Sequence, residues 1–333
     1  MKPTERFALL IQSYFSTYLV KQRDVSLQTV KAYRDTFRLL LNYLWKATGK
    51  RPDQLTLDDL SAANVLAFLQ HIENFRGNCV RTRNSRLAAL RSFFRFAIAS
   101  EGSDLLAQSQ QIMSIPIKRF TRPLMSFLSV NEMVAVLQST GDSWTGRRDH
   151  LLLLFLYNTG ARVSEALSVK VSDVQRHDFQ AVELLGKGRK ERMVPLWKET
   201  SRAIRNWVKS GGLTTNQLLF PNRFGTAMTR TAVQQRLHLH VQSAAEERCP
   251  SLRKRHISPH TIRHTTAMHL LQSGVTTPVI ALWLGHADPA TTHQYIEADL
   301  QMKEAALNRL QPPREKRGRF KPPTGLLRFL DSL

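Results

Sequence analysis

The chain has very little cysteine and no long apolar segment. Cys79 and Cys249 are the only cysteines among 333 residues, and they stand far apart and outside any metal-ligand spacing. This argues against a disulfide framework or a zinc module and fits a reducing cytoplasm. The longest strictly apolar run, Leu151 to Tyr157, is far shorter than the roughly 20 residues that cross a bilayer. We therefore expect a soluble, intracellular protein.

Acidic residues are also scarce. The 26 Asp and Glu residues are outnumbered by 48 Lys and Arg, which gives a net charge of +22 and a pI near 10.7. A folded protein this basic most often meets a polyanion, and nucleic acid is the leading candidate; a cationic surface that serves only solubility is the alternative. With 42% hydrophobic residues, a real core is expected. The N-terminus carries Glu5 and Gln12 and no small-residue cleavage site, so it predicts an amphipathic helix and not a signal peptide.

Several catalytic devices are missing as well. There is no GxxxxGK[ST] loop that would indicate ATP use, and the second half has no clustered Asp and Glu of the sort that a two-metal nuclease uses. His260 and His264 are four residues apart, which also suits a metal. However, the glutamate of a zinc-protease motif is absent, and no nearby Cys or carboxylate completes a ligand shell. We expect neither a metal nor a cofactor.

Residues 1–107 are predicted to form a helical domain without strands. Apolar residues recur at helical spacing over 27–45, where Gly49 should end the helix, and further helices are expected over 60–75 and 80–100. Arginine runs are usually solvated surface. Five arginines on the last of these helices, with no balancing acid before its end, favour contact with DNA phosphates or a groove instead. They are Arg81, Arg83, Arg86, Arg91 and Arg95.

The polar, basic segment 108–126 lacks sustained periodicity and is predicted to be a linker. A second domain is expected over 127–310. In it, Ser129 and Glu132 match a capping box, Ser258 and Pro259 mark another helix start, and two alternating runs, 181–185 and 192–196, predict a β-hairpin. The expected fold is mainly α with this small hairpin, which makes the second domain α+β. A short helix over 299–310 and a basic tail over 311–333 follow.

Two segments of the second domain gather charged residues suited to phosphate chemistry. Arg162 and Glu165 are three residues apart on a short predicted helix, so the carboxylate could orient the arginine; alone, such a pair is more often an ordinary surface ion pair. The hairpin tip GKGRKER presents Lys187, Arg189 and Lys190 on a turn. Its glycines allow close approach to a phosphate, and a lysine there could protonate a leaving oxygen, although charged hairpin tips are common.

Two further segments place histidines, an arginine and a tyrosine in the final quarter. His260 and Arg263 share one helix face and could hold a phosphate between them. His286 follows a helix-ending glycine, and Tyr295 comes nine residues later. A tyrosine hydroxyl, with a reference pKa of about 10, needs a cationic site that clamps phosphate before it can act as a nucleophile, and the rigid fork of arginine suits this. A lone tyrosine would more often be core or surface.

The strings TGARVSEAL, GKGRKERMVPL, SPHTIRHTTAMHLLQSG and LGHADPATTHQY, in this order, resemble the catalytic domain of the tyrosine recombinase (phage integrase) family. The helical N-terminal part resembles that family's core-binding domain. Within the family, the chain looks most similar to integrases carried by transposons and plasmids. The catalytic set implied by the resemblance is Arg162, Lys187, His260, Arg263, His286 and Tyr295, with Glu165 supporting Arg162.

The resemblance also implies the mechanism and the partners. The two arginines would bind the non-bridging oxygens of the scissile phosphate, and the two histidines would assist with hydrogen bonds or proton transfer. Lys187 would be the general acid for the 5′ oxygen, and Tyr295 would form a 3′-phosphotyrosine bond without metal or ATP. The expected partner is double-stranded DNA with specific recombination sites. It would be bound by a homotetramer, with or without other recombinases, in which the 299–310 helix docks on a neighbouring protomer. The expected location is the nucleoid in the cytoplasm.

Three other functions are compatible with parts of this pattern. A type IB topoisomerase would use the same chemistry to relax supercoils, although the two-domain layout favours a recombinase. A catalytically silent accessory protein derived from a recombinase would bind DNA only, although all six catalytic-type residues are present. A basic structural protein would explain the charge but not the ordered set of motifs.

Overall fold

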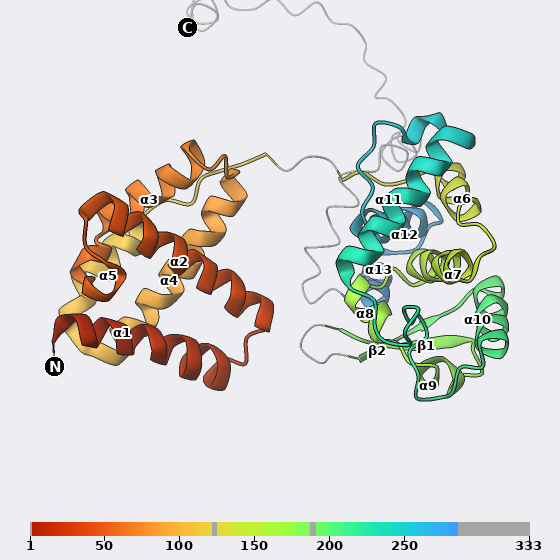
Figure 1. The fold of residues 1–333 in the computed structure, drawn as a ribbon, viewed down its shortest axis with the longest axis horizontal. Helices are drawn as coiled ribbons and strands as arrows, with labels where there is room; N and C mark the ends of the chain where they lie inside the picture. The colour runs from red at the N-terminus through yellow and green to blue at the C-terminus, as the bar shows by residue number, and fades with distance from the viewer. Residues whose placement is uncertain (1, 122–124, 187–190, 286–333) are drawn as a thin grey trace, which may run out of the picture. The chain divides into compact units, whose positions relative to one another are not determined.

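The computed structural model describes residues 2–121, 125–186 and 191–285 (Figure 1). The chain divides into two compact units, residues 1–123 and 124–333. Within the described ranges, no helix combines the length and the apolar character that crossing a membrane requires.

The described residues of the first unit form helices and connecting loops, with no strand. Its elements are α1 (Pro3–Ser13), a π-helical stretch (Tyr14–Gln22), α2 (Leu27–Thr48), α3 (Ala62–Asn74), α4 (Val80–Glu101) and α5 (Leu106–Ser114), with short 3-10 turns between some of them. The helices predicted over 27–45, 60–75 and 80–100 are confirmed, and α2 ends at Gly49 in the left-handed conformation. The core of the unit contains Phe37, Leu40, Phe68 and Phe93, all at most 3% exposed.

The segment predicted as a linker begins with a helix. Helix α5 buries Ile112 completely against the core of the unit. Arg91 of α4 donates from Nη2 to the carbonyl oxygens of Met113 (2.7 Å) and Ile115, at the end of α5. Helix-end carbonyls lack intrahelical partners, so these bonds stabilise the last turn. A nine-residue helix depends mainly on such tertiary contacts, which explains why the apolar pattern of the sequence did not reveal it.

In the second unit, helix α7 packs against further helices and a hairpin. Its elements are α6 (Val130–Gln138), α7 (Trp144–Thr159), α8 (Val163–Ser168), α9 (Ser172–Gln175), β1 (Ala181–Leu185), β2 (Glu191–Pro195), α10 (Lys198–Gly211), α11 (Arg230–Glu247), α12 (Pro259–Gln272) and α13 (Thr277–Leu284). The strands pair antiparallel, with Ala181 opposite Pro195 and Leu185 opposite Glu191. The predicted fold class, mainly α with a small hairpin, is confirmed (Figure 1).

Local sequence signals determine where two of these helices begin. The Ser129 hydroxyl accepts a hydrogen bond from the Glu132 backbone N–H (3.2 Å), and the Glu132 carboxylate accepts one from the Ser129 N–H (2.9 Å). This is the predicted capping box, which satisfies donors that the first helical turn leaves open. Ser258 caps α12 in the same way, with Pro259 at the first helical position.

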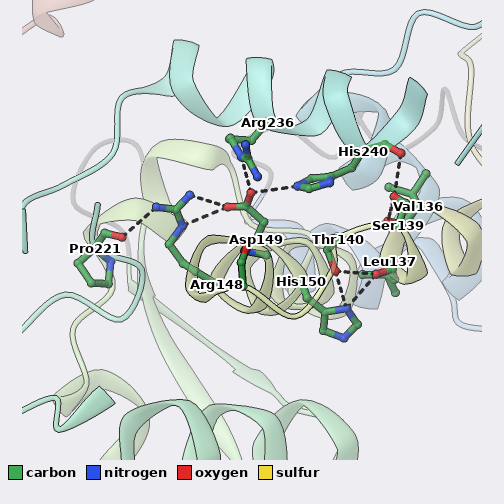
Figure 2. A network of polar contacts seen from close by, with 12 residues as sticks. Val136, Leu137, Ser139, Thr140, Arg148, Asp149, His150, Pro221, Arg236 and His240 are labelled. Carbon is green, nitrogen blue, oxygen red and sulfur yellow. Dashed lines mark hydrogen bonds and ion pairs between the residues drawn. The ribbon is translucent and has the colours of Figure 1, made fainter. Parts of the chain in front are cut away.

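A buried polar network joins α7 to α11 (Figure 2). Its centre is Asp149 on α7, whose side chain is 2% exposed. Asp149 accepts hydrogen bonds from Arg148 Nη2 (2.6 Å), Arg236 Nε (2.5 Å) and His240 Nε2 (2.9 Å). Burial acts to raise the pKa of Asp149, but these hydrogen bonds outweigh it and lower the pKa. The carboxylate therefore stays ionised and holds α11, whose N-terminal turns reach the site described next.

Candidate active site

Three helices contribute cationic side chains to one cavity of the second unit. The cavity has a volume of about 240 Å³ and is lined by the starts of α8, α11 and α12. The basic side chains at its wall are Arg162, Arg230, His260 and Arg263. Arg230 was not among the predicted site residues, because nothing local in the sequence connects the start of α11 with the other three. Packing of α11 places it there.

Arg162 is held at the start of α8 by a buried carboxylate. Its backbone N–H donates to Glu165 Oε2 (2.9 Å), and its Nη1 donates to Glu165 Oε1 (2.7 Å). The Glu165 side chain is 4% exposed and that of Arg162 is 32% exposed. The pair is therefore not an ordinary surface ion pair. Glu165 fixes one side of the guanidinium while Arg162 still reaches the cavity.

Arg192 on β2 is a second partner of Glu165, and it was not predicted as a site residue. Its Nη2 donates to Glu165 Oε2 (2.7 Å), and its Nε donates to the carbonyl oxygen of Trp283 (2.9 Å). Burial acts to raise the pKa of Glu165, but the hydrogen bonds from Arg192 and Arg162 outweigh it and lower the pKa. In the sequence, Arg192 was one of several cations beside the hairpin tip, and its carbonyl partner lies 91 residues later.

Arg263 on α12 is 4% exposed and bonds to the ends of two other helices. Its Nη1 donates to the carbonyl of Gly160 (2.6 Å) after α7, and its Nη2 donates to that of Leu284 (2.7 Å) at the end of α13. These bonds fix the guanidinium plane at the cavity wall. Gly160 has φ +59°, and a Cβ there would lie 2.4 Å from Leu284 Cδ2. Glycine thus meets both the backbone and the packing requirement at this position.

His260 lies in the first turn of α12, at the exposed side of the same cavity. Loss of hydration and then the positive charges of Arg263 and Arg162 lower its pKa. The imidazole is therefore neutral near pH 7, and a bound anion would raise its pKa again. One turn later, His264 is partly buried, and burial with its neighbours His260 and Arg263 lowers its pKa to about 4.

The structure brings together four of the predicted site residues, Arg162, Glu165, His260 and Arg263. The other predicted positions, Lys187, Arg189, Lys190, His286 and Tyr295, lie outside the described residues. Across the parts of the chain that the structure describes, no three His, Cys, Asp or Glu side chains are placed to hold a metal ion.

The five arginines of α4 occupy different environments. Arg83 is 2% exposed and donates to a backbone carbonyl of the segment after α5 (2.8 Å), and Arg91 binds the end of α5 itself. The expectation of five arginines turned towards DNA is therefore corrected for Arg83, because its guanidinium is enclosed within the unit. Arg81 and Arg95 are exposed and Arg86 is half-buried, so their contact with DNA stays a prediction.

Comparisons with known proteins agree over both units. The family model described as Phage integrase family matches residues 126–302, and that described as Phage integrase, N-terminal SAM-like domain matches residues 11–101. The chain is 43% identical over 327 residues to the integrase/recombinase y4rC of Sinorhizobium fredii, covering 98% of each chain. It is 30% identical to tyrosine recombinase XerC of Xanthomonas axonopodis pv. citri, covering 86% of this chain and 92% of that protein.

A solved structure shows the same fold. It is the XerH site-specific recombinase bound to palindromic difH substrate in a post-cleavage complex. The similarity has a TM-score of 0.66 at 22% sequence identity and covers 86% of this chain and 81% of that chain.

Proposed function

The chain belongs to the phage integrase family and is a tyrosine-type site-specific recombinase, and we propose that it cuts and rejoins double-stranded DNA through a bond between Tyr295 and a 3′ phosphate. The observation that carries this proposal is the convergence of Arg162, His260 and Arg263 on one cavity. An enclosed group of cationic and polar donors is what a phosphodiester needs when its oxygens gain charge in the transition state.

Arg162, Arg263 and His260 stabilise the scissile phosphate before and during attack by the tyrosine. Arg162 and Arg263 donate to its non-bridging oxygens. Because Glu165 holds one guanidinium and two carbonyls hold the other, little reorganisation is needed when DNA binds. His260, neutral in the free protein, donates a further hydrogen bond to the phosphate.

The bond-breaking and proton-transfer steps involve residues identified from the sequence motifs. The Tyr295 oxygen attacks phosphorus, the bond from phosphorus to the 5′ oxygen breaks, and Lys187 gives its proton to that oxygen. The tyrosine proton passes to a histidine, His260 or His286. The phosphotyrosine bond keeps the energy of the broken phosphodiester, so a 5′ hydroxyl of another strand reseals the DNA without ATP.

The charge of the chain supports DNA as the partner. A net charge of +22 favours association with the phosphate backbone and a steep dependence of binding on salt. We place the protein with DNA in the cytoplasm, as a homotetramer on paired recombination sites of a mobile element. Arg189 and Lys190 at the hairpin tip add to the phosphate contacts.

The test is a covalent trapping assay. Nicked DNA from the ends of the element that encodes the chain is incubated in EDTA with wild type and with Tyr295→Phe. The wild type should give a covalent protein–DNA band. The Phe variant should give none while binding DNA in a gel shift with unchanged affinity, because only the nucleophilic oxygen is lost. A covalent band in the Phe variant would remove Tyr295 from its assigned role.

The same assay separates the competing functions. A gel shift without a covalent band in the wild type would favour a silent DNA-binding protein. Relaxation of supercoiled DNA that lacks the cognate ends would favour a type IB topoisomerase.

A further inference from the structure

Arg192 connects the start of α8, which holds Arg162, with the end of α13, which holds Arg263. Its side chain is 10% exposed and makes two hydrogen bonds in different directions. Nη2 donates to Glu165, the carboxylate that orients Arg162, and Nε donates to the carbonyl of Trp283. The next carbonyl along the chain, that of Leu284, accepts from Arg263. A continuous series of contacts therefore runs from one phosphate arginine to the other through Arg192.

The turn after α13 lies directly on the Arg192 guanidinium. Gly285 has φ +64°, and a Cβ at this position would lie 2.9 Å from Arg192 Nη1 and 3.2 Å from Cζ. The backbone approaches the guanidinium so closely that a side chain at 285 would displace one or the other.

We propose that Arg192 is a positioning residue of the recombination reaction. It holds Glu165 against Arg162 and the end of α13 against Arg263, and so sets the separation of the two arginines that bind the scissile phosphate. This inference rests on the proposed function of the same site. Arg192 also connects that site with the hairpin, because it lies on strand β2, five residues after Lys187 in the sequence.

Arginine is needed because the two acceptors lie in different directions. The planar guanidinium donates from Nε and Nη2 at once, whereas the ammonium group of lysine is a single compact charge and cannot reach both acceptors in this geometry. Loss of the cation would leave the buried Glu165 with Arg162 as its remaining ion-pair partner among the described residues. Buried ions are tolerated only when they are well paired.

The first measurement is single-turnover cleavage of the nicked DNA by Arg192→Gln and Arg192→Lys in the full-length chain. We expect cleavage to slow by about 10–100-fold in Arg192→Gln, with DNA affinity unchanged, because the Arg192 side chain is 10% exposed and bonds to groups within the protein. Arg192→Lys keeps the charge and should recover part of the rate. It also serves as the second variant if Arg192→Gln folds poorly. The matched control is Arg176→Gln, which removes an exposed ion pair with Glu183 on β1 and should leave cleavage unchanged.

The pH dependence of cleavage distinguishes positioning from general weakening of the fold. The pKa of Glu165 is lowered in the folded protein, so its contribution is present above its unfolded pKa and disappears as the pH falls through the folded pKa. Without Arg192, the folded pKa moves upward, and cleavage should begin to fall at a higher pH than in the wild type. The other charged and titratable side chains of the cavity, Arg162, Arg230, His260 and Arg263, are unchanged in the variant. A merely structural defect would lower the rate equally at every pH.

Hydrogen exchange tests the geometry independently of the chemistry. The backbone amides at the end of α13 should exchange faster in Arg192→Gln than in the wild type and should be unaffected in Arg176→Gln. If the wild type forms no covalent adduct, the proposed function is wrong, and exchange still decides whether Arg192 holds α13. Wild-type exchange together with a wild-type cleavage rate and pH profile in Arg192→Gln would overturn the inference.

Discussion

Asp149 and Glu165 are both buried carboxylates held by arginines, yet they stand in different surroundings. Their side chains are 2% and 4% exposed. Asp149 binds Arg148, Arg236 and His240 in a network that joins α7 to α11 (Figure 2). Glu165 binds Arg162, which lines the cavity with His260 and Arg263. The first network joins two helices of the fold, and the second holds a side chain that lines a cavity.

Exposure alone does not separate the two networks. The side chain of Arg236 is 34% exposed and that of Arg162 is 32% exposed. The difference is that Arg162 converges with other cations on one cavity, whereas Arg236 is not part of the lining of that cavity. Clusters of arginine around a carboxylate therefore indicate a site only when further donors meet them across a space that a phosphate can enter.

The largest effect on stability is expected from Asp149→Asn. Breaking a buried ion network leaves uncompensated charge and costs about 3–5 kcal/mol. Urea unfolding followed by tryptophan fluorescence measures this. Four of the five tryptophans lie in the second unit, and the Trp144 ring lies 5.3 Å from the Arg148 guanidinium. Asp178→Asn, which affects a 78% exposed carboxylate, is the control and should change stability by less than about 0.5 kcal/mol. Equal effects of the two variants would mean that the Asp149 network contributes no net stability.

Arg162→Gln tests the contrast between the Asp149 and Glu165 networks by its effect on DNA cleavage. We expect single-turnover DNA cleavage to fall by about 10²–10³-fold, because one donor to the phosphate oxygens is lost, with little change in the urea midpoint. Arg236→Gln is the matched variant, since it removes an equally exposed arginine from the other buried carboxylate. It should lower the urea midpoint and leave cleavage normal at temperatures where the protein stays folded. Similar losses of cleavage in Arg162→Gln and Arg236→Gln would mean that the two networks do not differ in their effect on the reaction.

A smaller effect, on DNA binding, is expected from the arginines of α4, some of which are exposed and one of which is enclosed. Arg81 and Arg95 are exposed, whereas Arg83 is enclosed. The double variant Arg81→Gln with Arg95→Gln should reduce the slope of log K against log salt by about 2, one per lost phosphate contact. Fluorescence anisotropy between about 50 and 200 mM salt measures it. Arg83→Met should lower the melting temperature and leave the slope unchanged. If only Arg83→Met reduced the slope of log K against log salt, then Arg83, and not Arg81 and Arg95, would contact the DNA phosphates.

Features determined by neighbouring residues were predictable from the sequence. The capping box of Ser129 and Glu132, the end of α2 at Gly49 and the start of α12 at Ser258 follow from local hydrogen bonds and allowed backbone angles. The closeness of Arg162 to Glu165 follows from their spacing on a helix. In each case the partner lies within a few residues along the chain.

Features that depend on distant partners were not predictable. Helix α5 buries Ile112 in the core, and Arg91 of α4 donates to a carbonyl at its end; nothing in the sequence of 106–114 indicates these contacts. Arg192 looked like one more cation beside the hairpin tip, since its acceptors, Glu165 and the carbonyl of Trp283, lie in separate elements. Similarly, the enclosure of Arg83 follows from how the chain after α5 returns along α4.

The two carbonyls that hold Arg263 also determine when the site can exist during synthesis of the chain. One lies 103 residues before the arginine and the other 21 residues after it. Contacts between such distant positions form late in folding because the intervening chain must first be ordered. A nascent chain that has not yet reached Leu284, or one cut before it by a protease, lacks the second acceptor. The Arg263 guanidinium therefore takes up its position at the cavity wall only after α13 has joined the fold.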